Sequence, residues 1–322
     1  MQTEFVISAG EQPKRLDVFL VHREPKLSRA ALQRMITAGW VRVNDQTAKS
    51  SQRIKAGDVI AFDTPQAAPL RLNGQTTRLE ILFEDRACLV LNKPAGIVVH
   101  PAPGHWSNTL LNALLDHCVR LGEAATPSLV HRLDKDTSGV MVIAKTAEAH
   151  RGLAVQFECH SITRLYEALV WGVPAQEEGR IEFAIGPDRQ NPKRTSMRTL
   201  KPKAAVTEYQ VAEPVGAVAA RILLRPHTGR THQIRTHLQA IGHPILGDRD
   251  YGGGRVGAID GYEIPRVMLH ARTLGFTHPI TDAYCEFTVA APPDFDATYH
   301  LLHLGASCEG KASCYSESPE IC

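Results

Sequence analysis

The chain has 322 residues, with 36 lysines and arginines against 34 aspartates and glutamates, so whole-chain charge does not indicate a partner. A chain of this length can bury a large core, and we expect one large domain and one small module. The seven cysteines show no CxxC spacing, which argues against a disulfide or zinc framework. The start lacks a signal-peptide pattern and no apolar run could span a bilayer, so we expect a soluble, cytoplasmic protein.

The first part of the chain predicts a short tail, residues 1–12, followed by a compact module, residues 13–63. Residues 15–24 and 28–39 carry apolar side chains at helical spacing, with Ser28 as a predicted N-cap and Gly39 as a predicted stop. Two short strand patterns follow, at 41–45 and 58–62. The first sixty residues hold ten basic and six acidic side chains, an excess that a solvated face explains as well as nucleic acid does.

The rest of the chain predicts a second domain. Residues 64–78 are rich in Pro, Ala, Gln and Thr and are typical of a linker. From 79 to 305 strand patterns dominate, and helical patterns occur irregularly among them, at 109–122, 147–161 and 231–242. This order favours an α+β domain with a largely antiparallel sheet. Residues 306–322 are polar, and we expect a disordered tail there.

Residues 128–146, SLVHRLDKDTSGVMVIAKT, place Asp134 and Asp136 among basic side chains between two apolar runs. The segment is interpreted as a rigid turn at a strand end, where chemistry can occur. Three rival interpretations exist. A calcium loop would have Lys145 at its last liganding position, where a cation repels calcium. A haloacid-dehalogenase-type loop would follow a wholly apolar strand, but here His131 and Arg132 interrupt it. A plain salt-bridged hairpin would explain the segment if HRLD were isolated.

HRLD is not isolated. HRLDKDTSG at 131–139 resembles the signature of the RluA-type family of RNA pseudouridine synthases. The family's other motifs follow the same order and are listed here: KPAGIVVHP at 93–101, ITRLYEALVWG at 162–172, TGRTHQIRTHLQAIGHPILGDRDYGG at 228–253 and MLHA at 268–271. SRAALQRMITAGWVRVND at 28–45 is similar to an S4 RNA-binding domain. The resemblance implies a small S4-like α/β module and a pseudouridine synthase domain, a largely antiparallel mixed sheet flanked by helices and loops.

The resemblance also implies the site. Asp134 is the catalytic carboxylate that meets the positive charge developing on ribose when the glycosidic bond breaks, as in glycosidases. Whether it attacks C1′ or abstracts a ribose proton stays open. Arg235 matches the arginine that keeps this carboxylate ionised, and Arg230 is the competing choice. Asp136 is interpreted as a supporting residue.

The remaining pocket residues follow from the same motifs. Tyr166 matches the family tyrosine, which can stack on uracil and handle protons. Leu269 would line the pocket, although a plain core leucine is the alternative, and Arg132 would join Arg230 in contacting substrate. Arg164 stands where many members have lysine, which keeps the charge.

For RNA binding we predict side chains of the S4-like module, listed here: Arg15, Ser28, Arg29, Gln33 and Lys49. His232, His237 and His243 invite a metal interpretation, but the isomerisation needs no metal, so we expect no cofactor and RNA as the partner, with no membrane and no obligatory protein partner. S4-bearing branches mostly modify large-subunit (23S) ribosomal RNA, which is the favoured substrate. Transfer RNA, a catalytically idle RNA-binding protein and a haloacid-dehalogenase-type phosphatase are the alternatives.

Overall fold

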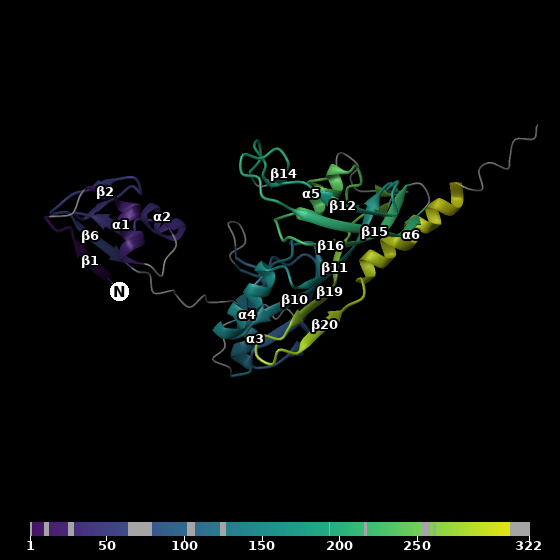
Figure 1. The fold of residues 1–322 in the computed structure, drawn as a ribbon, viewed down its shortest axis with the longest axis horizontal. Coiled ribbons are helices and arrows are strands. Elements are labelled where there is room, and N and C mark those ends of the chain that lie inside the picture. Colours follow the sequence, from purple (N-terminus) through teal and green to yellow (C-terminus); the bar gives the residue numbers. More distant parts are fainter. Residues whose placement is uncertain are drawn as a thin grey trace, which may run out of the picture. The chain divides into compact units, whose positions relative to one another are not determined.

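The described residues of the computed structural model form two compact units, Met1–Arg71 and Leu72–Cys322 (Figure 1). The description covers residues 2–9, 13–24, 29–63, 79–101, 107–122, 127–192, 194–215, 218–252, 258–259 and 262–309. The predicted linker, 64–78, lies outside it. No helix among these residues is both long and apolar enough to cross a membrane.

The amino-terminal unit is a small α/β module. Its elements are β1 (Gln2–Val6), β2 (Lys14–Arg15), α1 (Leu16–Arg23), α2 (Arg29–Thr37), β3 (Val41–Val43), β4 (Gln46–Thr47), β5 (Arg53–Ile54) and β6 (Val59–Asp63). Four strands form an antiparallel sheet in the order β1-β6-β3-β4, and β2 pairs with β5. Gly39 has a φ of +80° and its N–H bonds Ile36 O at 3.1 Å, so it closes α2 as predicted.

The predicted tail at residues 1–12 is wrong for its first part. Residues 2–6 are β1, which pairs with β6 over five residues, and Ile7 is buried in the core of this unit. The short apolar run Phe5-Val6-Ile7 is a weak strand signal by itself, and β1 forms through pairing with β6, more than fifty residues away.

The larger unit is an α+β domain. Its strands are β7 (Glu80–Glu84), β8 (Cys88–Lys93), β9 (Ser128–Leu129), β10 (Ser138–Ala144), β11 (Thr163–Trp171), β12 (Glu178–Glu182), β13 (Gly186–Pro187), β14 (Thr195–Ser196), β15 (Val206–Val215), β16 (Ala219–Pro226), β17 (Ala258–Ile259), β18 (Tyr262–Glu263), β19 (Leu269–Thr277) and β20 (Tyr284–Thr288). Its helices are α3 (Leu110–Arg120), α4 (Ala147–Glu158), α5 (Gln233–Ala240) and α6 (Pro293–Glu309).

A ten-stranded sheet dominates this unit, with the order β12-β15-β16-β11-β19-β10-β8-β7 and with β20 and β9 as side strands. Every pairing in it is antiparallel except one: β10 runs parallel to β19, with Ser138 opposite His270 and Gly139 opposite Ala271. The predicted α+β class with a largely antiparallel mixed sheet is therefore confirmed.

Alternate residues of the central strands face different helices. Leu91 of β8 packs in one cluster with Leu114 of α3, whereas its neighbour Val90 packs in another with Leu153 of α4. Both faces of β8 and β10 are thus covered, which explains why β10 is apolar almost throughout.

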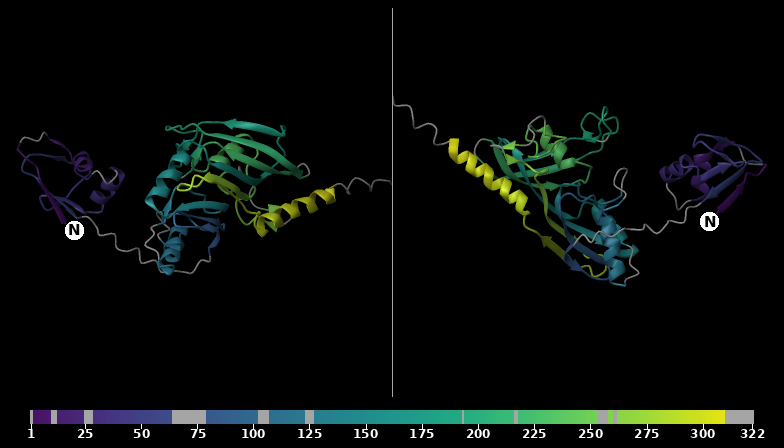
Figure 2. Two further views of the ribbon diagram at one scale, coloured as in Figure 1. Left: turned by 60° about the horizontal axis from the view of Figure 1, so that its bottom comes forward. Right: turned by 180° about the vertical axis from the view of Figure 1, so that it is seen from behind.

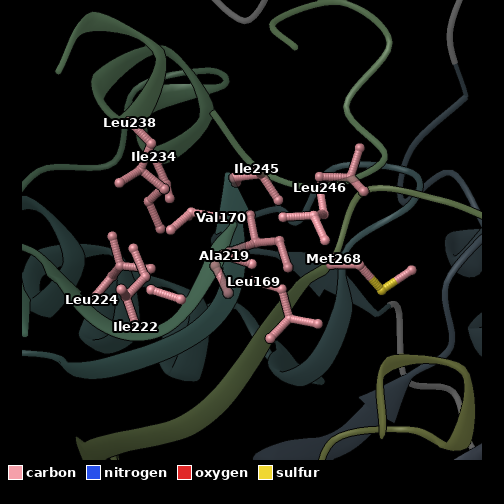
Figure 3. Packing of buried hydrophobic residues seen from close by; sticks show 14 of the residues in the cluster. Leu169, Val170, Ala219, Ile222, Leu224, Ile234, Leu238, Ile245, Leu246 and Met268 are labelled. Atoms are coloured by element: carbon pink, nitrogen blue, oxygen red, sulfur yellow. The ribbon is translucent and has the colours of Figure 1, made fainter. Parts of the chain in front are cut away.

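The third core cluster positions the candidate site. Ile234 and Leu238 of α5 face Leu224 and Ile222 of β16 (Figure 3). This packing fixes α5 on the sheet beside β11, so side chains from the first turn of α5 and from β11 can reach one pocket. Figure 1 also shows β14 beside α5.

The structure adds one helix and shortens one strand pattern. Helix α6 was not predicted; it contacts β15 along one side of the unit (Figure 2) and continues to Glu309, four residues into the predicted tail 306–322. Residues 310–322 lie outside the described chain. The segment SLVHRL at 128–133 also has a strand-like sequence pattern, but only Ser128–Leu129 form a strand, because the chain then bends into the HRLD loop.

Candidate active site

A pocket of about 500 Å³ opens between the HRLD loop, β11 and the start of α5. All six predicted residues of the larger unit line it, and they are listed here: Arg132, Asp134, Tyr166, Arg230, Arg235 and Leu269. They come from four segments of the chain, at 132–134, 166, 230–235 and 269, of which the first and last lie more than a hundred residues apart. The fold therefore brings the predicted site together.

The loop that carries Asp134 is anchored by a buried cation. Lys93, at the end of β8, is 0% exposed, and its Nζ donates to Pro94 O at 2.9 Å, Ile97 O at 3.1 Å and Lys135 O at 3.0 Å. Burial lowers the pKa of Lys93 to about 8. The lysine thus fixes the backbone one residue after Asp134.

His131 anchors the start of the same loop. Its Nε2 accepts a hydrogen bond from the N–H of Val142 at 3.1 Å, and its ring stacks on Phe157 with centroids 4.6 Å apart. Burial, assisted by the charge of Arg164, lowers the pKa of His131 to about 3, so the imidazole is neutral. Only a neutral imidazole has a ring nitrogen without a proton, which can accept a hydrogen bond from an N–H group.

Arg235 connects Asp134 to two other carboxylates. Its Nε and Nη2 donate to the two oxygens of buried Asp248 at 2.7 and 2.9 Å, and Nη2 also donates to Asp250 at 3.0 Å. Nη1 donates to Asp134 Oδ2 at 3.4 Å. Burial alone would lower the pKa of Arg235, but the hydrogen bonds and charge of Asp248 outweigh it and raise the pKa. The guanidinium therefore stays charged, and its Nη1 stays directed at Asp134.

His232 lies on the other side of Asp134. Its Nε2 is 3.9 Å from Asp134 Oδ1, and its Nδ1 is 2.8 Å from the hydroxyl of buried Tyr251. The Tyr251 hydroxyl also accepts the N–H of Thr195 at 2.8 Å, and its ring lies 4.7 Å from the Arg235 guanidinium. His232 has a φ of +51°, a conformation that is uncommon outside glycine and that recurs at functional sites.

Tyr166 lies on β11, at a register shift in the pairing with β19 that turns its side chain toward the pocket. Burial and then the Asp134 charge raise its pKa, against the opposing charge of Arg164. Tyr166 is therefore a neutral phenol at pH 7. Leu269, only 4% exposed, starts β19 opposite Ala168 and gives the pocket an apolar wall.

The two arginines predicted to contact substrate differ from Arg235. Arg132 is exposed in the HRLD loop, and Arg230 is exposed and donates from Nε to Ala204 O at 3.2 Å. The arginine that contacts Asp134 is Arg235 and not Arg230. Asp136 has its backbone oxygen bonded by Arg266 at 3.1 Å.

The predicted RNA-binding residues of the amino-terminal unit lie partly together. Arg15 and Lys49 line one groove of this unit. Arg15 forms a two-bond contact with buried Asp17, at 3.0 and 3.1 Å, and Gln33 donates to the same carboxylate at 3.0 Å. Arg29 begins α2, and Ser28 lies outside the described residues.

The histidines considered as metal ligands point to different partners. His237 Nδ1 contacts Thr207 Oγ1 at 2.9 Å, and His243 Nδ1 contacts Trp171 O at 3.0 Å. Within the described chain, one cluster has ligand atoms close together, namely Asp85, Cys88 and His278.

The histidine of that cluster is held by protein contacts. Backbone N–H groups of Ile280 and Thr281 donate to His278 Nδ1 at 3.4 and 3.2 Å, and His278 Nε2 faces Asp85 at 3.0 Å. Burial raises the pKa of Cys88 to about 12. The group fits a structural His–Asp contact.

Sequence reasoning missed His232 as a neighbour of Asp134, and it missed Asp248, Asp250 and Tyr251, which hold Arg235. All four lie within the segment 228–253 quoted for its resemblance. The acidic residues Asp248 and Asp250, so near a predicted catalytic arginine, were a usable signal. The burial of Asp248 and Tyr251 could not be predicted, because it depends on the packing of α5.

Comparisons with known proteins give a consistent result. The sequence profile described as RNA pseudouridylate synthase matches residues 87–240, and that of the S4 domain matches residues 14–60. The chain is 41% identical to "Ribosomal large subunit pseudouridine synthase D" of Zymomonas mobilis, covering 90% of this chain and 94% of the relative. A protein of the same name from Pseudomonas aeruginosa is 39% identical, covering 91% and 95%. The solved structure "Human RNA Pseudouridylate Synthase Domain Containing 4" superposes with a TM-score of 0.58 at 27% identity, covering 69% and 92%.

Proposed function

We propose that this chain, which belongs to the RNA pseudouridylate synthase family and is an isomerase that makes pseudouridine in RNA, acts on large-subunit ribosomal RNA. The substrate is inferred from the names of the relatives in Zymomonas and Pseudomonas. Because ribosomal RNA is a cytoplasmic molecule in such cells, we assign the enzyme to the cytoplasm. The observation that supports the chemistry best is the charged pair of Asp134 and Arg235 in one pocket with Tyr166.

Asp134 is the group that acts on ribose. Breaking the N1–C1′ bond leaves positive charge on the sugar, and a carboxylate stabilises that charge or bonds to it. The Asp134 side chain is 21% exposed and lines the pocket, so a flipped-out nucleotide can reach it. Attack at C1′ and abstraction of a ribose proton both remain open for this carboxylate.

Arg235 and Tyr166 prepare the two reacting halves. Arg235 directs a fixed positive charge at Asp134 and orients its carboxylate, because Asp248 holds the guanidinium on its other edge. Tyr166 offers a flat neutral ring on which uracil can stack, with Leu269 as an apolar wall. The product is an isomer of the substrate, because the proton that leaves C5 is balanced by one gained at N1, so the reaction needs no redox partner and no attacking water.

The RNA itself would be held by phosphate contacts. Arg132 and Arg230 stand exposed at the pocket, and Arg15 and Lys49 line the groove of the amino-terminal unit. Phosphate contacts position an RNA without specifying its sequence. The target uridine would leave its stack to enter the pocket.

The test is single-turnover tritium release from C5-labelled uridine in unmodified large-subunit ribosomal RNA, with excess EDTA present. We expect Asp134→Asn to abolish release while its RNA affinity stays near that of the wild type, because it removes only the charge that meets C1′. Asp136→Asn is the matched control and should retain substantial activity. An active Asp134→Asn protein, or an equally inactive Asp136→Asn protein, would refute the assignment.

Mapping pseudouridine in cells lacking the protein separates the substrates. Loss from large-subunit ribosomal RNA supports the proposal, and loss from transfer RNA alone contradicts it. Unchanged modification everywhere would favour an RNA-binding protein without activity.

A further inference from the structure

A fourth arginine, Arg164, lines the pocket and has no part in the mechanism given above. Arg164 is on β11, two residues before Tyr166, and both side chains line the pocket. Its Nη2 donates to His227 O at 3.2 Å. A Cβ built on Gly229 would lie 3.3 Å from its Nη1, so the guanidinium is packed tightly against the loop before α5.

Among the described residues, Arg164 has no carboxylate within ion-pair distance, whereas Arg235 has three. Its Nε is buried and has no hydrogen-bond partner in the part of the chain that the structure describes. Burial lowers the pKa of Arg164. A partly buried cation without a counter-charge is costly, and at a ligand pocket the counter-charge can come from the ligand.

The pocket has a polarity that indicates where this cation acts. Asp134 lines the pocket from the HRLD loop, whereas Tyr166 and Arg164 line it from β11. The Asp134 carboxylate and the Arg164 guanidinium both act on the pKa of the Tyr166 phenol, in opposite directions. A uracil stacked on Tyr166 with C1′ at Asp134 therefore shares the pocket with the Arg164 guanidinium.

We propose that Arg164 is a further catalytic residue, which stabilises the negative charge on uracil while the N1–C1′ bond is broken. The inference rests on the proposed function. When the bond breaks, its electron pair stays with uracil and spreads over the ring and its two carbonyl oxygens. On one route C1′ bonds to Asp134, and C5 then displaces the Asp134 carboxylate from C1′. On the other route Asp134 takes the C2′ proton to leave a C1′=C2′ alkene, and C5 bonds C1′ while Asp134 returns that proton to C2′. On both routes the C5 proton then leaves and N1 gains a proton.

This role makes Arg164 a counterpart of Asp134. The carboxylate meets the positive half of the separating charges, and the guanidinium meets the negative half. Fixed donors directed at developing charge in a site shielded from water contribute most to the chemical step and little to substrate affinity. Lysine at this position would supply the same charge with fewer donors.

The experiment compares two leaving groups in the full-length protein. Large-subunit ribosomal RNA is transcribed with either uridine or 5-fluorouridine, in which fluorine makes uracil a better leaving group. Single-turnover loss of the unreacted nucleoside is measured at saturating enzyme by nuclease digestion and mass spectrometry. The variants are Arg164→Gln and Arg164→Lys, and Arg272→Gln is the matched control, a half-buried β19 arginine outside the pocket that pairs with Glu167.

We expect Arg164→Gln to slow uridine conversion by about 10²-fold, as loss of one oxyanion donor does, and 5-fluorouridine conversion by about tenfold or less. Arg164→Lys should stay within about tenfold of the wild type, and Arg272→Gln should match it. An equal loss on both substrates would show a structural role and overturn the proposal. A loss of filter-binding affinity with an unchanged saturated rate would show a phosphate contact and also overturn it. Wild-type protein that makes no pseudouridine would instead refute the proposed function.

Discussion

The most demanding prediction concerns Asp248, which holds the guanidinium of Arg235. Asp248→Asn removes the buried negative charge and places an amide N–H or a single oxygen where two carboxylate oxygens accept bonds at 2.7 and 2.9 Å. Asp248 Oδ1 also accepts the N–H groups of Asp250 and Tyr251, at 3.1 and 3.0 Å. Breaking one partner of a buried ion pair costs about 3–5 kcal/mol.

The expected loss in the free energy of unfolding is thus about 3 kcal/mol at least. For a unit of this size that lowers the melting temperature by roughly 6–12 °C. Asp250→Asn is the matched control. Asp250 bonds the same guanidinium at 3.0 Å but its side chain is 55% exposed, so its contribution should be about 0–1 kcal/mol.

Differential scanning calorimetry measures both variants. The transition of the larger unit should shift in Asp248→Asn, while that of the amino-terminal unit should not. The turnover rate of Asp248→Asn should also fall, because Arg235 is no longer aimed at Asp134. A shift below about 2 °C, or equal shifts in Asp248→Asn and Asp250→Asn, would refute the reasoning that burial gives this contact its strength.

Three other predictions follow from the same structure. Gly139→Ala should prevent stable folding, because its Cβ would lie 2.1 Å from a backbone oxygen of β19. Gly96 also has a positive φ but lies in open space, so Gly96→Ala should cost about 1 kcal/mol. Yields of folded protein and melting temperatures test the difference between the two variants. The pKa of His131 in the folded protein is about 3, so its contribution to stability is present above pH 6.5 and is lost as the pH falls toward 3. The melting temperature of His131→Asn should therefore depend less on pH across that range than the melting temperature of the wild type. An unchanged pH dependence would contradict this prediction. Removing residues 1–70 should weaken RNA binding and flatten its salt dependence in filter-binding assays, and an unchanged salt slope would exclude phosphate contacts there.

The sequence predicted the reacting residues of the site better than the residues that hold them in place. Asp134, Tyr166 and Arg235 stand in motifs whose residue types and order resemble those of one family, and the fold brings all three to one pocket. Their roles stay proposals. Asp248 and Tyr251 were missed because nothing local says that they are buried against α5. Such contacts arise from packing between segments and not from a pattern along one segment.

The fold was predicted in outline, because only those elements with a local sequence signal could be recognised. Strands with apolar alternation and capped helices such as α3 carry local signals, whereas β1 becomes a strand through its partner β6. Helix α6 had a weak signal, since its buried Phe295 and Leu302 lie seven residues apart. The predicted boundaries failed at both ends of the chain, where the apolar pattern is sparse.

The parallel pairing of β10 with β19 has a consequence for biosynthesis. Ser138, four residues after Asp134, is bonded through its hydroxyl to His270, which follows 132 residues later. At roughly 5–20 residues per second, a ribosome needs roughly 7–26 s to make that interval. During this time the amino-terminal unit can fold on the nascent chain while the strand that completes the pocket does not yet exist. A nascent chain could therefore hold RNA before it can modify it, and activity would begin only near the end of translation.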